Sequence, residues 1–271
     1  MIVDSAKVEK EKPRLAASLL AATLLLGCAG AARVDRWINE ATQSHQAGDY
    51  LRATVLMERA LRTVEQRQGA DAKTAEISAA LSVLYFVQGR LGHAAKLSER
   101  AVAIEERLGN ERNLAEALKI QGGVYAMQGR LAEAEPVLRR SVQMRERLWG
   151  PDHPEVAEAL GNLGAVYIDS DRKEDASRIL DRALSIYKRS GSPDPVYAPN
   201  AMVNRAKLHS LAGESAEAER LFKEALAIRS AAFGKRHPQT ANIAKSYAAF
   251  LKERGRTDEA AVVEGASAIN H

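Results

Sequence analysis

Two interleaved series of turn residues divide most of this chain into units of nearly equal length. The first series recurs at an almost constant interval, at Gly48, Gly89, Gly129, Asp171, Gly213 and Gly255. The second series keeps nearly the same interval, at Gly69, Gly109, Gly150, Gly191 and Gly234. Glycine suits both positions because a tight turn between helices and the end of a helix usually require a left-handed backbone. The spacing therefore predicts a chain of repeated helical hairpins.

The apolar residues within each unit follow helical spacing. In the unit at residues 150–191, the first half places Val156, Leu160, Leu163, Gly164 and Tyr167 on one face, and the second half places Ala176, Ile179, Leu180, Ala183, Leu184 and Ile186 on another. Two helices alone cannot bury so wide an apolar face, so each unit needs a copy of itself on either side. We therefore predict an all-α solenoid of about six antiparallel helix pairs, with repeats at about 33–70, 71–110, 111–150, 151–191, 192–234 and 235–271.

Composition and charge support a folded helical chain and argue against nucleic acid as a partner. The sequence is 46% hydrophobic but only 5% aromatic, which is typical of a nearly all-helical protein. Its 39 basic and 35 acidic residues are well mixed, and the net charge is only +4. Because no basic stripe stands out, we expect an ordinary solvated surface and no nucleic-acid interface.

The N-terminus carries the pattern of an export signal. Basic residues in 1–14 precede an uncharged apolar run at 15–27, and Cys28, the only cysteine, follows at once. The stretch Leu25-Leu26-Gly27-Cys28 resembles a bacterial lipobox. This resemblance implies a signal peptide at 1–27, lipidation of Cys28 and a tether at 28–32 before the solenoid at 33–271. In that family, Ala29 after the cysteine points to an outer-membrane lipoprotein that faces the periplasm.

Two other interpretations of the N-terminus stay open. The uncharged stretch at 15–32 is borderline in length for a helix that anchors the chain in the inner membrane. Cleavage without lipidation would instead release a soluble periplasmic protein. Both alternatives still place the repeats in the cell envelope, outside the cytoplasm.

The repeat pattern resembles the tetratricopeptide repeat, and the motif positions are occupied by Leu160, Leu163, Gly164, Tyr167, Asp171, Ala176, Leu180 and Ala183. The long period, together with the linkers at 150–157 and 234–241, looks like the kinesin-light-chain type. The resemblance covers about residues 33–265 and implies a right-handed superhelix that binds proteins. In the first linker, Pro154 suits the first turn of the next helix and Asp152 is expected to cap it. We expect His153 and His237, which share one register, to pack in the linkers.

The groove that such a superhelix presents to a partner is lined by the first helix of each repeat. Counting 100° per residue away from the core positions selects the candidate partner-binding residues, which are Asn39, Val83, Val87, Ile120, Met127, Asn162, Asp169, Asn200, Asn204 and Lys207. An asparagine can donate to and accept from an extended peptide backbone, although it also suits a solvated face. The apolar strip of Ala80, Val83, Val87, Ile120 and Met127 indicates a bound apolar segment, unless another helix of the chain covers it.

No catalytic motif accompanies the repeats. The sequence has no glycine-rich phosphate loop, no H-E-x-x-H and no nucleophile elbow, and its histidines lack ligand spacing. We therefore expect a non-enzymatic, membrane-tethered scaffold that binds a segment of a partner protein and assembles or localises an envelope complex. We expect no cofactor, metal or small-molecule substrate. Two alternatives are a structural, oligomerising solenoid with an empty groove, and a cytoplasmic peptide-binding regulator if the N-terminal signal is misread.

Overall fold

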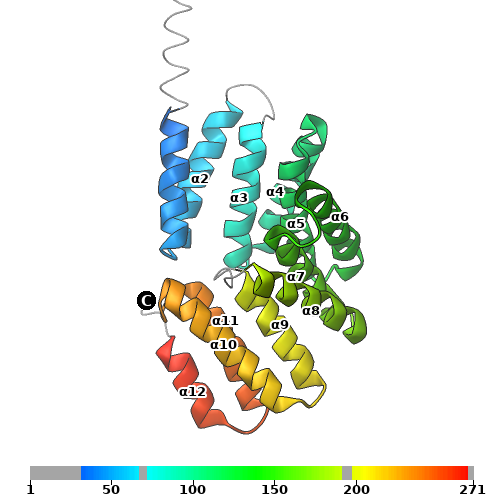
Figure 1. Cartoon of the computed structure of the whole chain (residues 1–271). Coiled ribbons are helices and arrows are strands. Elements are labelled where there is room, and N and C mark those ends of the chain that lie inside the picture. Colours follow the sequence, from blue (N-terminus) through cyan, green and yellow to red (C-terminus); the bar gives the residue numbers. More distant parts are fainter. Residues whose placement is uncertain (1–31, 67–71, 191–196, 268–271) are drawn as a thin grey trace, which may run out of the picture.

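The structure, a computed structural model, describes residues 32–66, 72–190 and 197–267, and its regular elements there are all helices (Figure 1). A helix at 32–46 pairs with α2 (Tyr50–Glu65), and the following pairs are α3 (Ala72–Val87) with α4 (Leu91–Leu108), α5 (Glu111–Met127) with α6 (Leu131–Trp149), α7 (Pro154–Asp169) with α8 (Lys173–Arg189), α9 (Ala198–Leu211) with α10 (Ser215–Phe233), and α11 (Pro238–Lys252) with α12 (Thr257–Ala266). The predicted all-α solenoid is confirmed. The predicted signal peptide, Cys28, Gly69 and Gly191 lie outside the described residues.

The turns and the helix crossings within a pair explain the recurring small residues. Asp171, with a φ of 56°, holds the left-handed turn conformation that glycine supplies in the other hairpins. Inside the pairs, a Cβ at Gly122 would lie 2.5 Å from Leu138 Cγ, and one at Gly164 would lie 2.7 Å from Leu180 Cγ. These two glycines therefore let the two helices of a pair approach closely around a fully buried leucine.

The linkers before α7 and α11 are built around histidine. The Nδ1 atom of His153 accepts a hydrogen bond from the backbone N–H of Glu155 at 3.2 Å, and His237 does the same for Gln239. Each histidine is therefore the N-cap, and a proline follows it as the first helical residue. The expectation that Asp152 caps α7 is wrong. Asp152 lies one residue before the cap position, and its carboxylate accepts from Arg189 at 2.6 Å instead.

The two ends of the solenoid contact each other (Figure 1). The Nε2 atom of His237, before α11, lies 3.1 Å from the carbonyl oxygen of Gln46 in the first hairpin turn. Since Nδ1 of His237 accepts from Gln239, Nε2 is the atom that donates, which is the pattern of a neutral imidazole. Gly48 is so close to Pro238 that a Cβ would lie 2.7 Å from the proline Cδ. We call this meeting of residues 46–50 with 237–239 the end contact.

Successive first helices contact one another, from α3 through α5, α7 and α9 to α11, and this places them on the inner side of the curve. Within the described ranges, no helix is long and apolar enough to cross a membrane.

Candidate partner-binding groove

A groove of about 450 Å³ opens on the inner side of the first three helix pairs. Its walls come from the helix at 32–46, from α3 and from α5, and its floor includes residues of α2 and α4. The lining consists of Ala41, Thr42, His45, Met57, Ala75, Glu76, Ala79, Ala80, Val83, Leu84, Ala101, Glu105, Asn113, Glu116, Ala117 and Ile120. Most of these side chains are apolar, so the groove can bury an apolar segment.

Part of the predicted apolar strip forms the wall of this groove. Val83 and Ile120, both half-buried, line it together with Ala80. Val87 and Met127 lie further along α3 and α5, beyond the lining, and are 39% and 59% exposed. The C-terminal helix α12 packs against α11 and not against α3 or α5, the helices that carry the strip.

The other predicted residues lie outside the groove lining. Asn39, Asp169 and Lys207 are exposed, and Asn162 is half-buried. Two asparagines already have partners within the chain: Asn200 Oδ1 accepts from Arg229 at 3.0 Å, and Asn204 Nδ2 donates to the Gly161 carbonyl at 3.4 Å. The structure therefore gathers Val83 and Ile120 into one site and leaves the asparagines spread along the inner side.

The polar part of the groove lining is acidic. Glu76, Glu105 and Glu116 belong to it, and none of the lining residues in the described ranges is a lysine or an arginine. Two of these carboxylates have cations beside them outside the lining, since Lys73 Nζ lies 2.9 Å from Glu76 and Lys119 Nζ lies 2.8 Å from Glu116.

Glu105 is the third carboxylate, and it has no such cation among the described residues. The residue is 2% exposed. One carboxylate oxygen accepts from Asn113 Nδ2 at 3.2 Å, while the other, Oε2, is buried without a hydrogen-bond partner in the described part of the chain. Burial raises the pKa of Glu105, and the hydrogen bond from Asn113 offsets only part of this effect.

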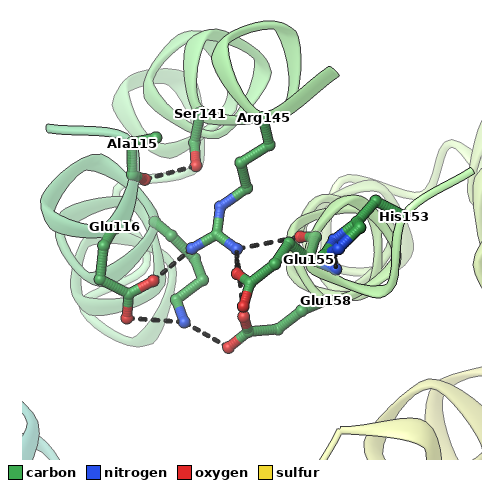
Figure 2. Close-up of polar contacts among 8 residues, drawn as sticks. Ala115, Glu116, Ser141, Arg145, His153, Glu155 and Glu158 are labelled. Atoms are coloured by element: carbon green, nitrogen blue, oxygen red, sulfur yellow. Dashed lines mark hydrogen bonds and ion pairs between the residues drawn. The ribbon is translucent and has the colours of Figure 1, made fainter. Parts of the chain in front are cut away.

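Beside the groove, a partly buried ionic cluster joins α5, α6 and α7 (Figure 2). The guanidinium of Arg145, which is 1% exposed, donates to the carboxylates of Glu116 and Glu155 and lies 3.3 Å from Glu158. It also donates to the Glu155 carbonyl at 3.0 Å. Lys119 bridges Glu116 and Glu158. We call these five residues the ionic cluster.

The ionic cluster is a network of ion pairs, although its carboxylates are spaced as metal ligands could be. One oxygen each from Glu116, Glu155 and Glu158 lies within 4.8 Å of the others, but each of these carboxylates is already paired with Arg145, Lys119 or both. Burial alone would lower the pKa of Lys119, and the attraction of Glu116 and Glu158 outweighs it and raises that pKa. For Glu158 burial dominates and raises the pKa, whereas for Glu116 the two cations outweigh burial and lower it. The cluster therefore fixes three consecutive helices relative to one another.

Arg145 and Glu105 share a register that the sequence prediction missed. Glu105 follows the turn glycine Gly89 by the same number of positions as Arg145 follows Gly129 and Arg229 follows Gly213. Arg229 is also buried and donates to Gln239. The recurrence was visible in the sequence as buried-face positions that carry a charged residue.

The tetratricopeptide repeat model matches residues 113–189 and 197–262, just over half of the chain. The chain therefore belongs to the tetratricopeptide repeat family.

Solved structures of the same fold agree with this assignment. BtubC (BKLC) from P. vanneervenii is 24% identical over 83% of this chain and 91% of its own, with a TM-score of 0.61. TPR-like repeats of a putative kinesin light chain from Podosopora anserina are 18% identical over 73% of this chain and 95% of their own, with a TM-score of 0.57. A Rap protein complexed with Competence and Sporulation Factor is 10% identical over 85% of this chain and 72% of its own, with a TM-score of 0.66. No curated protein sequence matches the chain.

Proposed function

We propose that this protein is a non-enzymatic scaffold that holds a segment of a partner protein in the groove between the first three helix pairs. The observation that carries this proposal is the groove itself, with its apolar wall of Ala80, Val83 and Ile120 on the inner side of a tetratricopeptide solenoid. The Rap structure supports it, since that protein has the same fold and was solved in a complex.

Site-specific photocrosslinking in the native cell tests this proposal. Benzoylphenylalanine is placed at Val83 in the groove or, as a control, at Val262, which is 72% exposed on α12. We expect a partner adduct from position 83, and its loss when Ile120 is also replaced by Asp. Adducts from position 262 alone would refute groove binding and favour a structural solenoid that assembles through its outer surfaces.

The asparagines of the inner side extend the proposed site toward the C-terminus. We propose that Asn162 and Asn204 hydrogen-bond the backbone of a longer bound segment, because both lie on first helices of adjacent repeats and their amides can donate and accept. Their replacement by alanine is expected to weaken partner binding while the chain stays folded. Unchanged binding would limit the contact to the groove.

We also propose that the scaffold is tethered to a membrane through lipidated Cys28, faces the periplasm and assembles or localises an envelope complex. Support comes from the apolar run that ends in Leu25-Leu26-Gly27-Cys28. Acyl chains contribute about 0.8 kcal/mol per buried CH₂, so two or more hold a protein stably on a bilayer. The test is the mass of the mature protein from membranes, compared with Cys28→Ala. An intact leader in both forms would exclude the lipoprotein and require fractionation to locate the chain.

A further inference from the structure

Three hairpins carry a buried polar side chain at one register of the second helix, counted from the turn glycine: Glu105, Arg145 and Arg229. Each is hydrogen-bonded to a side chain at the start of the next helix, namely Asn113, Glu155 and Gln239 respectively. In the two hairpins that carry arginine at this register, the guanidinium extends between neighbouring first helices and donates to acceptors on both. The side chain of Glu105 is shorter than these arginines, carries the opposite charge and borders the open groove.

Among the described residues, the groove lacks a cation to match Glu105. Glu76 and Glu116 are paired with Lys73 and Lys119. The imidazole of His45 also lines the groove, but burial lowers its pKa and nearby His237 lowers it further, so it is neutral at pH 7. Glu105 Oε2 is therefore a buried acceptor without a donor, beside a cavity of about 450 Å³. A buried carboxylate oxygen without a partner is unfavourable, and a cationic donor would satisfy both its charge and its hydrogen bonding.

Resting on the proposed function, we propose that the groove binds a Lys or Arg side chain of the partner segment, with the charged group on Glu105 Oε2. The bound Lys or Arg would then play the part at Glu105 that Arg145 plays at the same register of the next hairpin. The aliphatic stem of either side chain, and an apolar residue beside it, fit against Val83 and Ile120. The cavity is larger than one basic side chain needs, so an extended segment fills it better than a free amine does.

The test uses the full-length chain in detergent and a displayed library of random heptapeptides. Peptides are selected on the unaltered protein, and those that also bind Val83→Asp are discarded. Binding of the remaining peptides is then measured for Glu105→Gln, which keeps the acceptor for Asn113 but removes the charge. Glu106→Gln is the matched control, because it removes a neighbouring carboxylate of α4 that lies outside the groove lining and is already paired with Arg140. Melting temperatures confirm that each variant is folded.

We expect the selected peptides to carry Lys or Arg next to an apolar residue. Loss of one charge-assisted hydrogen bond corresponds to binding that is about tenfold weaker or more for Glu105→Gln, whereas Glu106→Gln should change it about twofold or less. Exchange of the peptide arginine for citrulline should cause the same loss with unaltered protein and no further loss with Glu105→Gln. This arm keeps the test valid even if the protein variant unfolds.

Three results would overturn the inference. Peptides that bind in a Val83-dependent manner but carry no basic residue would refute the proposed Lys or Arg ligand. Equal binding to Glu105→Gln and to the unaltered protein would also refute it. Self-association of the chain that Val83→Asp abolishes would identify a second copy as the occupant. If no peptide binds in a Val83-dependent manner, the proposed groove function itself fails, and that outcome is distinct from these three.

Discussion

Replacement of Gly48 by alanine measures how much the end contact stabilises the solenoid. Gly48 has a φ of 81°, and an alanine in this left-handed conformation costs about 1–2 kcal/mol. The new methyl would also lie 2.7 Å from Pro238 Cδ and 3.0 Å from Cγ, well inside carbon–carbon contact distance. The proline ring is rigid and begins α11, so the clash is relieved only when the two ends separate. Overpacking of this kind typically costs about 1–3 kcal/mol.

Gly89 is the matched control for this substitution. Its φ is 72°, yet a Cβ built there meets nothing within 4 Å. Gly89→Ala therefore carries the backbone penalty alone, and the difference between the two variants reports the end contact. The excess loss cannot exceed the free energy of the end contact, because the chain can always open there.

Urea unfolding followed by circular dichroism supplies the measurement. We expect Gly48→Ala to lower the free energy of unfolding by about 1–3 kcal/mol more than Gly89→Ala. Removal of the ring, in the double variant Gly48→Ala with Pro238→Ala, should recover most of that excess. Equal losses in the two glycine variants, or no recovery in the double variant, would refute the reasoning.

Three further perturbations follow from the geometry. Arg145→Met leaves Lys119 as the cation for Glu116, Glu155 and the buried Glu158, and should lower the free energy of unfolding by about 3 kcal/mol. Arg229→Met leaves the neutral amides of Asn200 and Gln239 and should lower it by about 1 kcal/mol. Similar losses of the two variants in urea unfolding would contradict this ranking. Gly164→Ala places a methyl 2.7 Å from Leu180 Cγ and should cost about 1–3 kcal/mol, with less than the summed loss when Leu180→Ala is added; strict additivity in a double-mutant cycle would count against the close approach. Because burial raises the pKa of Glu105, its stabilising contribution as a protonated group is complete below the ordinary value of 4.5 and is lost as the pH rises through the raised value. Glu105→Gln should therefore gain stability relative to the unaltered chain between pH 4 and pH 7, and a constant difference in unfolding free energy would be inconsistent with the shift.

The sequence was sufficient for the fold because each repeat shows the same pattern again. The turn residues, including Asp171, and the core positions around Leu180 depend on contacts within one hairpin or between neighbours. Val83 and Ile120 were found for the same reason, since helical periodicity alone identifies the face that turns away from the core. These predictions needed no knowledge of the curvature of the superhelix.

The missed features depend on that curvature or on which charged side chain points inward. Asn200 accepts from Arg229 across the two helices of one hairpin, and that pairing depends on the Arg229 side chain pointing inward. Arg145 lies in a helix rich in arginine and glutamate, where solvated and buried charges look alike in sequence. The end contact joins residues separated by 191 positions. Small rotations accumulate from repeat to repeat to produce it, and no local pattern records their sum.

An open solenoid resembles a row of coupled elements in which each repeat senses only its two neighbours, so its terminal repeats unravel first and its body extends like a spring. Here the hydrogen bond from His237 to Gln46 returns the row to its beginning. The first and last helix pairs are then held to each other, and they cannot separate without breaking this contact. Since the first pair that forms the groove is held by the last, a substitution that breaks the end contact from the C-terminal side is expected to alter the width of a binding site built from the opposite end of the sequence.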